Sequence, residues 1–227
     1  MLVVAALLTI SPWTIRNARE LHAFVPISTQ FGSALAGTYN DAARGDTQNP
    51  AAWQGIRHVP DYAYLFRRVG TTNEAVLESE LRTASLHYIS KHPTYVAKVG
   101  WWNTRRMLDL ASRRRSRATA ATITINHYWA DRGILCFWIF AALALAGAFT
   151  TMARRTPWYV WAMPILMFFS VVFLVVETPR YRTPIDPFLV LLAAAALVTA
   201  ARRALAHKSI GPASLRQRTS APATPAA

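Results

Sequence analysis

Two arginines and a tyrosine lie in a short segment that prolines restrict. Residues 177–187 read ETPRYRTPIDP, so Arg180, Tyr181 and Arg182 are enclosed by prolines at positions 179, 184 and 187. Proline fixes φ, and the segment should therefore hold its side chains in place. A fixed guanidinium group binds a phosphate through two parallel hydrogen bonds. The segment predicts a phosphate-binding site or, on the simpler interpretation, an interfacial anchor in which an arginine pairs with Glu177.

The segment stands between apolar runs that are long enough to cross a membrane. Residues 133–153 and 157–176 carry no charge, and a bilayer core requires about 20 such residues. A third run, residues 184–201, is shorter and rich in alanine. We predict three transmembrane helices, the first two forming a tight hairpin. Pro164 lies inside the second and should kink it without breaking it.

Another apolar run, residues 1–13, opens the chain and is too short to cross a bilayer. A signal peptide is one interpretation, but a signal peptide requires basic residues before its apolar run. No basic residue precedes Arg16 in this chain. We therefore predict a partial transmembrane helix at residues 1–13, the end of a span that begins upstream of Met1.

Basic residues in short loops indicate the orientation. Arg154 and Arg155 follow the first span, and Arg202 and Arg203 follow the third, which places both pairs on the cytoplasmic side. Residues 14–131 then form an external insert, residues 132–205 hold the three spans, and residues 206–227 form a disordered cytoplasmic tail rich in proline, alanine, serine and threonine. The predicted fold class is mainly α, a polytopic helical membrane protein of the cell membrane with a mixed, mostly helical insert.

Within the insert, residues 24–60 have the composition of loops with short extended or helical pieces. Helical patterns begin at Asp61, and Thr71 and Glu74 form a capping box for the next helix. Pro93 should end that helix and open another. The apolar residues that share one face of the first of these two helices are Leu77, Leu81, Ala84 and Tyr88.

Aromatic and basic residues follow Pro93. Trp101 and Trp102, with Lys98, Arg105 and Arg106 nearby, suit either a helix at the lipid headgroups or a tryptophan pair in the core of the insert. The run ASRRRSR at residues 111–117 is either a solvated loop or a site for anionic headgroups. Its external placement argues against nucleic acid as a partner, although the net charge is +14.

Other kinds of site have no pattern in this sequence. Cys136 is the one cysteine, so no internal disulfide or cysteine metal site is possible. The six histidines are scattered, and His87 and His92 have poor spacing for a metal. We expect no metal and no cofactor, and no catalytic triad or glycine-rich phosphate loop is present.

Three motifs together resemble a known family. The segments ISPWTIRN, FVPIST and PRYRTPIDP occur in this order at residues 10–17, 24–29 and 179–187. They are similar to the C-terminal part of polyprenyl-phosphate-dependent glycosyltransferases of the GT-C class, including glycosyltransferase family 39 and the protein mannosyltransferase-like proteins of bacteria. The stretch GTYNDAARGDTQNPAAW also looks like bacterial members. At positions 30–31 this chain has Gln-Phe where the family often has Asn-Gly.

The resemblance implies an enzyme that moves a sugar from a polyprenyl-phosphate donor to an external acceptor, which is a glycan, a lipid or a protein. It implies that Arg180 and Arg182, with Tyr181, hold the donor phosphate, and that Arg16 and Asn17 line the same cavity. Ser28, Thr29 and Gly32 match the family's external segment. The family's catalytic carboxylate lies in an earlier loop that nothing here matches. No catalytic residue is therefore expected in this chain, which should be inactive alone.

Two other classes stay open. One is a non-catalytic membrane protein whose basic external insert binds an anionic glycolipid or a partner protein. The other is a transporter subunit, which would favour ionisable residues within the spans. The two longer spans carry none, so transport ranks last.

Overall fold

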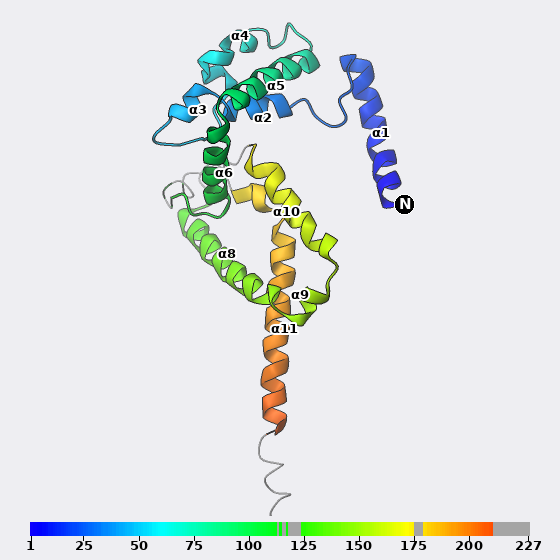
Figure 1. Cartoon of the computed structure of the whole chain (residues 1–227), viewed down its shortest axis with the longest axis vertical. Coiled ribbons are helices and arrows are strands. Elements are labelled where there is room, and N and C mark those ends of the chain that lie inside the picture. Colours follow the sequence, from blue (N-terminus) through cyan, green and yellow to red (C-terminus); the bar gives the residue numbers. More distant parts are fainter. Residues whose placement is uncertain (113, 115–116, 118–123, 175–178, 211–227) are drawn as a thin grey trace, which may run out of the picture. The chain divides into compact units, whose positions relative to one another are not determined.

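The structure is a computed structural model of the chain, and it describes residues 1–112, 114, 117, 124–174 and 179–210. This part is mainly α-helical, as predicted, and contains no strand beyond one isolated bridge between Val69 and Thr72. The chain forms two compact units (Figure 1). Unit 1 holds Met1–Ile125 and Leu166–Arg182, and unit 2 holds Asn126–Ile165 and Thr183–Ala227.

The core of unit 1 forms where α2 (Phe31–Thr38) packs on α5 (Glu74–Lys91) (Figure 1). Gly32 permits the close approach, because a Cβ atom there would lie 2.3 Å from the carbonyl oxygen of Glu78. We predicted loops with short extended or helical pieces at residues 24–60, and the short helical pieces are confirmed. α2 is made of small and apolar residues, and its Leu35 and Ala36 are almost completely buried. The other short elements of this region are α3 (Asp41–Gly45), η1 (Ile56–His58), η2 (Pro60–Tyr62) and α4 (Ala63–Phe66).

The start of α5 differs from the prediction. Its N-cap is Asn73, whose side-chain oxygen accepts a hydrogen bond from the amide of Ala75 at 2.9 Å. The predicted capping box is wrong because Thr71 instead donates its hydroxyl to the carbonyl of Arg68. The predicted apolar face is confirmed: Leu81 is buried, and the others of that face pack against the two apolar clusters of the unit. Pro93 opens α6 (Pro93–Met107) directly after α5, as predicted.

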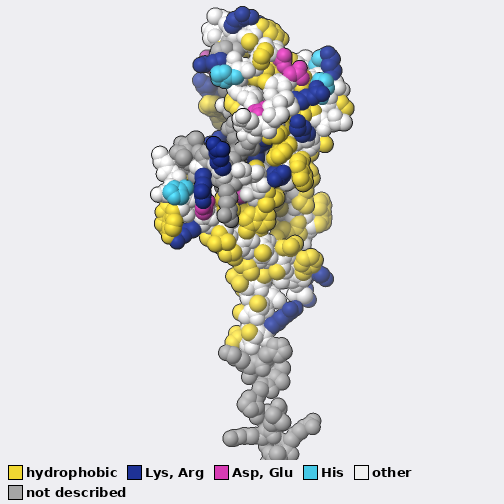
Figure 2. All heavy atoms as spheres, turned by 90° about the vertical axis from the view of Figure 1, so that its left-hand side faces the viewer, with side chains coloured by type: hydrophobic (Ala, Val, Ile, Leu, Met, Phe, Trp, Pro, Cys, Tyr) yellow, Lys and Arg dark blue, Asp and Glu magenta, His cyan; other side chains and the backbone are white. Residues whose placement is uncertain are grey.

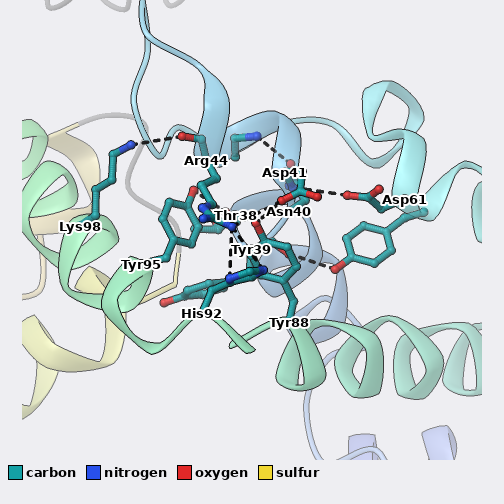
Figure 3. Close-up of polar contacts among 12 residues, drawn as sticks. Thr38, Tyr39, Asn40, Asp41, Arg44, Asp61, Tyr88, His92, Tyr95 and Lys98 are labelled. Atoms are coloured by element: carbon teal, nitrogen blue, oxygen red, sulfur yellow. Dashed lines mark hydrogen bonds and ion pairs between the residues drawn. The ribbon is translucent and has the colours of Figure 1, made fainter. Parts of the chain in front are cut away.

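Buried tyrosine hydroxyls join separate segments of unit 1 (Figure 3). Tyr95 of α6 donates to the carbonyl of Thr38 at 3.1 Å. Tyr39 donates to the carbonyl of Phe173 at 2.7 Å. Burial raises the pKa of Tyr39 to about 12 and raises the pKa of Tyr95 as well. Both hydroxyls therefore stay protonated as donors at neutral pH.

Unit 2 contains the longest apolar helices. α8 (His127–Ala148) and α11 (Asp186–Ile210) are long and apolar enough to cross a membrane. Within the 18-residue apolar stretch of each helix, only 17% is buried in α8 and 11% in α11. Hydrophobic side chains accordingly form a broad band in Figure 2, at the height of α9 and α11 in Figure 1. Most of the apolar surface of these helices thus faces outward, as it would toward lipid.

The bounds of the predicted spans need correction. The first, 133–153, is one helix from His127 to Ala148, and the chain then turns into α9 (Thr151–Arg155) because Thr150 caps α9 by accepting from the amide of Ala153 at 3.3 Å. Within 157–176 the structure has α10 (Trp158–Val172), which is 15 residues long. Pro164 lies inside α10 without breaking it, as predicted.

Two terminal predictions also change. α1 (Leu2–Leu21) covers residues 2–13 of the predicted partial span and extends well into the polar sequence. It is not among the helices long and apolar enough to cross a membrane. At the other end, residues 206–210 continue α11, because the alanine-rich sequence favours helix beyond the apolar run, whereas we predicted disorder from residue 206. Residues 211–227 lie outside the described part.

Close backbone contact defines the packing inside unit 2. A Cβ atom at Gly147 of α8 would lie 1.8 Å from the carbonyl oxygen of Leu192 in α11. The neighbouring contact residues are also small, and Ala144, Ala193 and Ala195 are buried. Small residues allow two helix backbones to approach where no hydrophobic driving force acts between helices in lipid.

Candidate functional site

The first two motifs of the sequence are joined directly by hydrogen bonds in unit 1. Three side chains near the end of α1 donate to consecutive backbone carbonyls of the loop that follows. These bonds are Asn17 to Val25 (3.1 Å), Thr14 to Pro26 (2.9 Å) and the Trp13 indole to Ile27 (2.9 Å). His22, with φ of 50° at the end of α1, starts the return of the chain. The spacing in PWTIRN thus serves to hold FVPIST against the helix.

A pocket of 360 Å³ lies beside this junction. Asn17 is only 5% exposed, and its side-chain amide donates to the carbonyl of Val25 in the loop. Asn17 therefore positions the pocket wall. Arg16 lines the same pocket, is exposed, and has its guanidinium carbon 5.2 Å from the centre of the Trp13 ring. The remaining polar lining residues include Glu20, Ser28, Thr29, Gln30 and Glu74. This mixture of donors and acceptors matches sugar hydroxyls better than a bare phosphate.

The third motif forms the short helix η3 (Pro179–Arg182), also in unit 1. The guanidinium of Arg182 donates to the carbonyl of Met107 at 2.9 Å and lies 3.5 Å from a carboxylate oxygen of Asp109. The two charged side chains are 13% and 6% exposed. Arg182 therefore fixes η3 to the end of α6.

The local structure at the end of α6 explains why the anchor lies there. The amide of Asp109 donates to the carbonyl of Arg106 and the amide of Leu110 to that of Arg105, which is a Schellman ending. Asp109 has φ of 55°, a left-handed conformation that aspartate tolerates better than most residues. A cation at the C-terminus of a helix also interacts favourably with the helix dipole.

Arg180 lies in the same turn in a different environment. It is exposed, and its guanidinium carbon is 5.2 Å from the centre of the Tyr181 ring. One of its nitrogens is 3.5 Å from the Tyr181 hydroxyl. The structure thus gives the two arginines different surroundings, Arg182 at a buried anchor and Arg180 at the surface. The predicted pairing partner Glu177 lies outside the described residues.

The two tryptophans of α6 have different surroundings. Trp101 is 62% exposed, whereas Trp102 packs against the buried cluster that contains Tyr95 and Val99. Arg105 lies over Trp102, with its guanidinium carbon 4.9 Å from the ring centre. Neither interpretation holds for both residues, because adjacent positions on a helix point in directions 100° apart.

Arg106 is the clearest residue that sequence reasoning missed. One of the two interpretations of this helix placed Arg106 near the headgroups with its basic neighbours, but Arg106 is only 4% exposed. It donates to Asn103 Oδ1 at 2.9 Å and to the carbonyls of Ala51 and Pro50. A helix face with Val99, Asn103 and Arg106 spaced three or four residues apart is the signal that was available.

A second polar cluster joins α3 to α5 and α6 (Figure 3). The Tyr88 hydroxyl donates to Asp41 at 2.7 Å, and Arg44 lies 3.1 Å from a ring nitrogen of His92. Burial and the bond to Asp41 raise the pKa of Tyr88 to about 12. Among the described residues, no group of three or more histidine, cysteine or acidic side chains could hold a metal ion. Residues 113, 115 and 116 of the basic run at 111–117 lie outside the described residues.

Comparison of the chain with known protein families, with curated proteins and with solved structures finds no match. The chemistry of the site must therefore be argued from its own residues.

Proposed function

We propose that the chain belongs to an integral-membrane glycosyltransferase that moves a sugar from a polyprenyl-phosphate donor to an acceptor outside the membrane. In this function Arg180 contacts the donor phosphate and Arg182 holds the segment in position. The observation that carries the proposal is the contrast between these two arginines, which the short helix η3 places in one turn.

The surroundings of Arg180 suit an anionic ligand. Its guanidinium is exposed and lies in a turn that Arg182 secures through Met107 and Asp109. A guanidinium in a secured turn loses less conformational freedom on binding a phosphate than one on a flexible loop. As the phosphate leaves the sugar, the positive charge would stabilise the negative charge that develops.

The pocket beside α1 supports a polar ligand as well. Its hydroxyl and amide groups, together with Arg16, resemble the donor and acceptor groups that recognise a sugar. Asn17 contributes indirectly because it holds the loop that carries Ser28 and Thr29. The motif PWTIRN would then contribute one ligand-facing residue and one positioning residue.

The membrane arrangement is part of the same proposal. α8 and α11 cross the bilayer. α10, which lies between them in the sequence, makes a third crossing together with the residues at its two ends. Arg154 and Arg155 lie on the cytoplasmic side, and residues 14–131 and 179–183 lie outside. This orientation puts η3 at the level of lipid headgroups, where a prenyl phosphate would be accessible.

The test is photo-crosslinking in membranes that contain the full chain. The probe is a radiolabelled polyprenyl-phosphate hexose with a photoreactive group near the phosphate. We expect labelling that excess polyprenyl phosphate prevents and that phosphatidylglycerol at equal concentration does not. Arg180→Gln should reduce labelling about tenfold, because a charge-assisted hydrogen bond contributes about 1.5–3 kcal/mol.

Arg57→Gln is the matched control, because it removes an exposed charge from unit 1 at a distance in sequence from the motifs. It should leave labelling unchanged. Equal labelling of Arg180→Gln and the unaltered chain would remove the role of Arg180. Labelling that phosphatidylglycerol prevents as well as polyprenyl phosphate does would contradict a polyprenyl donor.

A non-catalytic glycolipid-binding protein is the second candidate, and one observation favours it. A 740 Å³ pocket in the insert is lined by Trp102, Arg114 and the polar loop at residues 47–50. An aromatic ring beside amide groups and a cation suits a charged glycan. Trp102→Ala would abolish binding of an anionic glycolipid if this pocket is the site, and Arg180→Gln would leave that binding intact.

A further inference from the structure

A further pocket lies entirely within unit 2, near the turn between α8 and α10. It has a volume of 630 Å³, and its walls include Trp158, Trp161, Pro164, Ile165 and Leu192. Most of this lining is apolar. Arg154 of α9 is the one charged residue that lines it among the described residues.

Two of the polar side chains that line this pocket already donate to nearby backbone carbonyls. The Trp161 indole donates to the carbonyl of Ala153 at 3.2 Å, which fixes that ring as a wall. The Thr156 hydroxyl donates to the carbonyl of Met152 at 3.1 Å. The guanidinium of Arg154 is exposed and has no hydrogen bond or ion pair with any described residue. An arginine with five donors therefore lies at the rim of an apolar pocket without a carboxylate beside it.

We propose that this pocket binds one anionic phospholipid, with the headgroup phosphate on Arg154 and part of an acyl chain along the tryptophan walls. Charge complementarity selects an anionic headgroup, since the lining residues that the structure describes include one cation and no acidic residue. Trp158 is 77% exposed. Tryptophan favours the level of the headgroups, because there its apolar ring can contact lipid while its nitrogen contacts water. The apolar walls would exclude a fully hydrated free phosphate.

This site is distinct from the proposed donor site, because its residues belong to unit 2 and those of η3 to unit 1. It depends on unit 2 lying in a membrane, but not on any sugar transfer. Failure of donor binding or of sugar transfer therefore leaves this proposal standing.

The experiment is native mass spectrometry of the full chain in detergent, titrated with phosphatidylglycerol or with phosphatidylcholine of the same acyl chains. We expect the chain to retain one phosphatidylglycerol about tenfold more tightly than phosphatidylcholine. Arg154→Gln should abolish this preference. Arg155→Gln is the matched control, because it removes the same charge from the next residue, whose side chain does not line the pocket. This variant should keep the preference within about twofold.

Two further measurements keep the test decisive. Arg154→Lys retains the charge but not the two-pronged geometry, so it should bind phosphatidylglycerol with intermediate affinity even if the glutamine variant folds poorly. Inorganic phosphate added at the lipid concentration should not displace the lipid. Equal binding of the two lipids, equal loss in the Arg154 and Arg155 variants, or displacement by inorganic phosphate would each overturn the proposal.

Discussion

Replacement of Arg182 tests how η3 is held. In Arg182→Gln the carboxylate of Asp109, which is 6% exposed, would lose the guanidinium 3.5 Å away, and the carbonyl of Met107 would lose its 2.9 Å donor. Removing one partner of a buried ion pair costs about 3–5 kcal/mol. The 3.5 Å separation and the 13% exposure of Arg182 point to the lower end, about 3 kcal/mol. For a chain of this size each kcal/mol lowers the melting temperature by about 2–4 °C, so the shift should be roughly 6–12 °C.

The assay is a tryptophan-fluorescence melt of the full chain in detergent, with Arg180→Gln as the matched control. Arg180 is exposed, so its replacement should shift the melt by less than about 2 °C. The double variant with Asp109→Asn should lose less than the sum of the two single changes, by about 1 kcal/mol or more. Equal melting of the two arginine variants, or strict additivity in the double variant, would refute the anchoring role of Arg182.

Three further predictions follow from other contacts. Gly147→Ala should weaken the packing of unit 2, because its new methyl would meet a backbone carbonyl of α11 at 1.8 Å, whereas Gly133→Ala on the same helix has open space and should be neutral or slightly stabilising in a thermal melt. Asn17→Ala should cost about 1–3 kcal/mol, because the buried carbonyl of Val25 loses its donor, and protease cleavage between residues 22 and 30 should become faster. Tyr39 has a raised pKa, so the stability it contributes is complete below pH 10 and is lost as the pH rises through about 12; Tyr39→Phe should make that alkaline loss shallower in melts recorded from pH 9 to 12.

The helical class was predictable because it depends on long, periodic patterns. The apolar runs are long enough that they are helical in any arrangement, and the proline at 93 can only begin a helix or interrupt one. The ends of these helices were less predictable. Thr150 caps a separate short helix inside what is one uncharged run, and nothing in the composition of that run marks the turn.

The core position of α2 escaped prediction for a physical reason. Its small residues have weak local preference, and the helix is stabilised by packing on α5 through Gly32, a contact between residues far apart in the sequence. Arg106 was missed for the same reason, because its acceptors at Pro50 and Ala51 lie more than fifty residues away. The candidate site followed the same division. Residue types identified Arg180 and Arg182, but their difference depends on Asp109, which only the folded chain brings near.

The most direct test of the account is to measure which side of the membrane η3 faces. In a Cys136→Ser background, Thr183→Cys places one exposed thiol beside η3, and Met152→Cys places one beside Arg154. Intact cells are treated with a membrane-impermeant maleimide before and after permeabilisation. We predict that the thiol at 183 reacts in intact cells and that the thiol at 152 reacts only after permeabilisation. Reaction at 183 only after permeabilisation would place Arg180 inside the cell and contradict an external donor site.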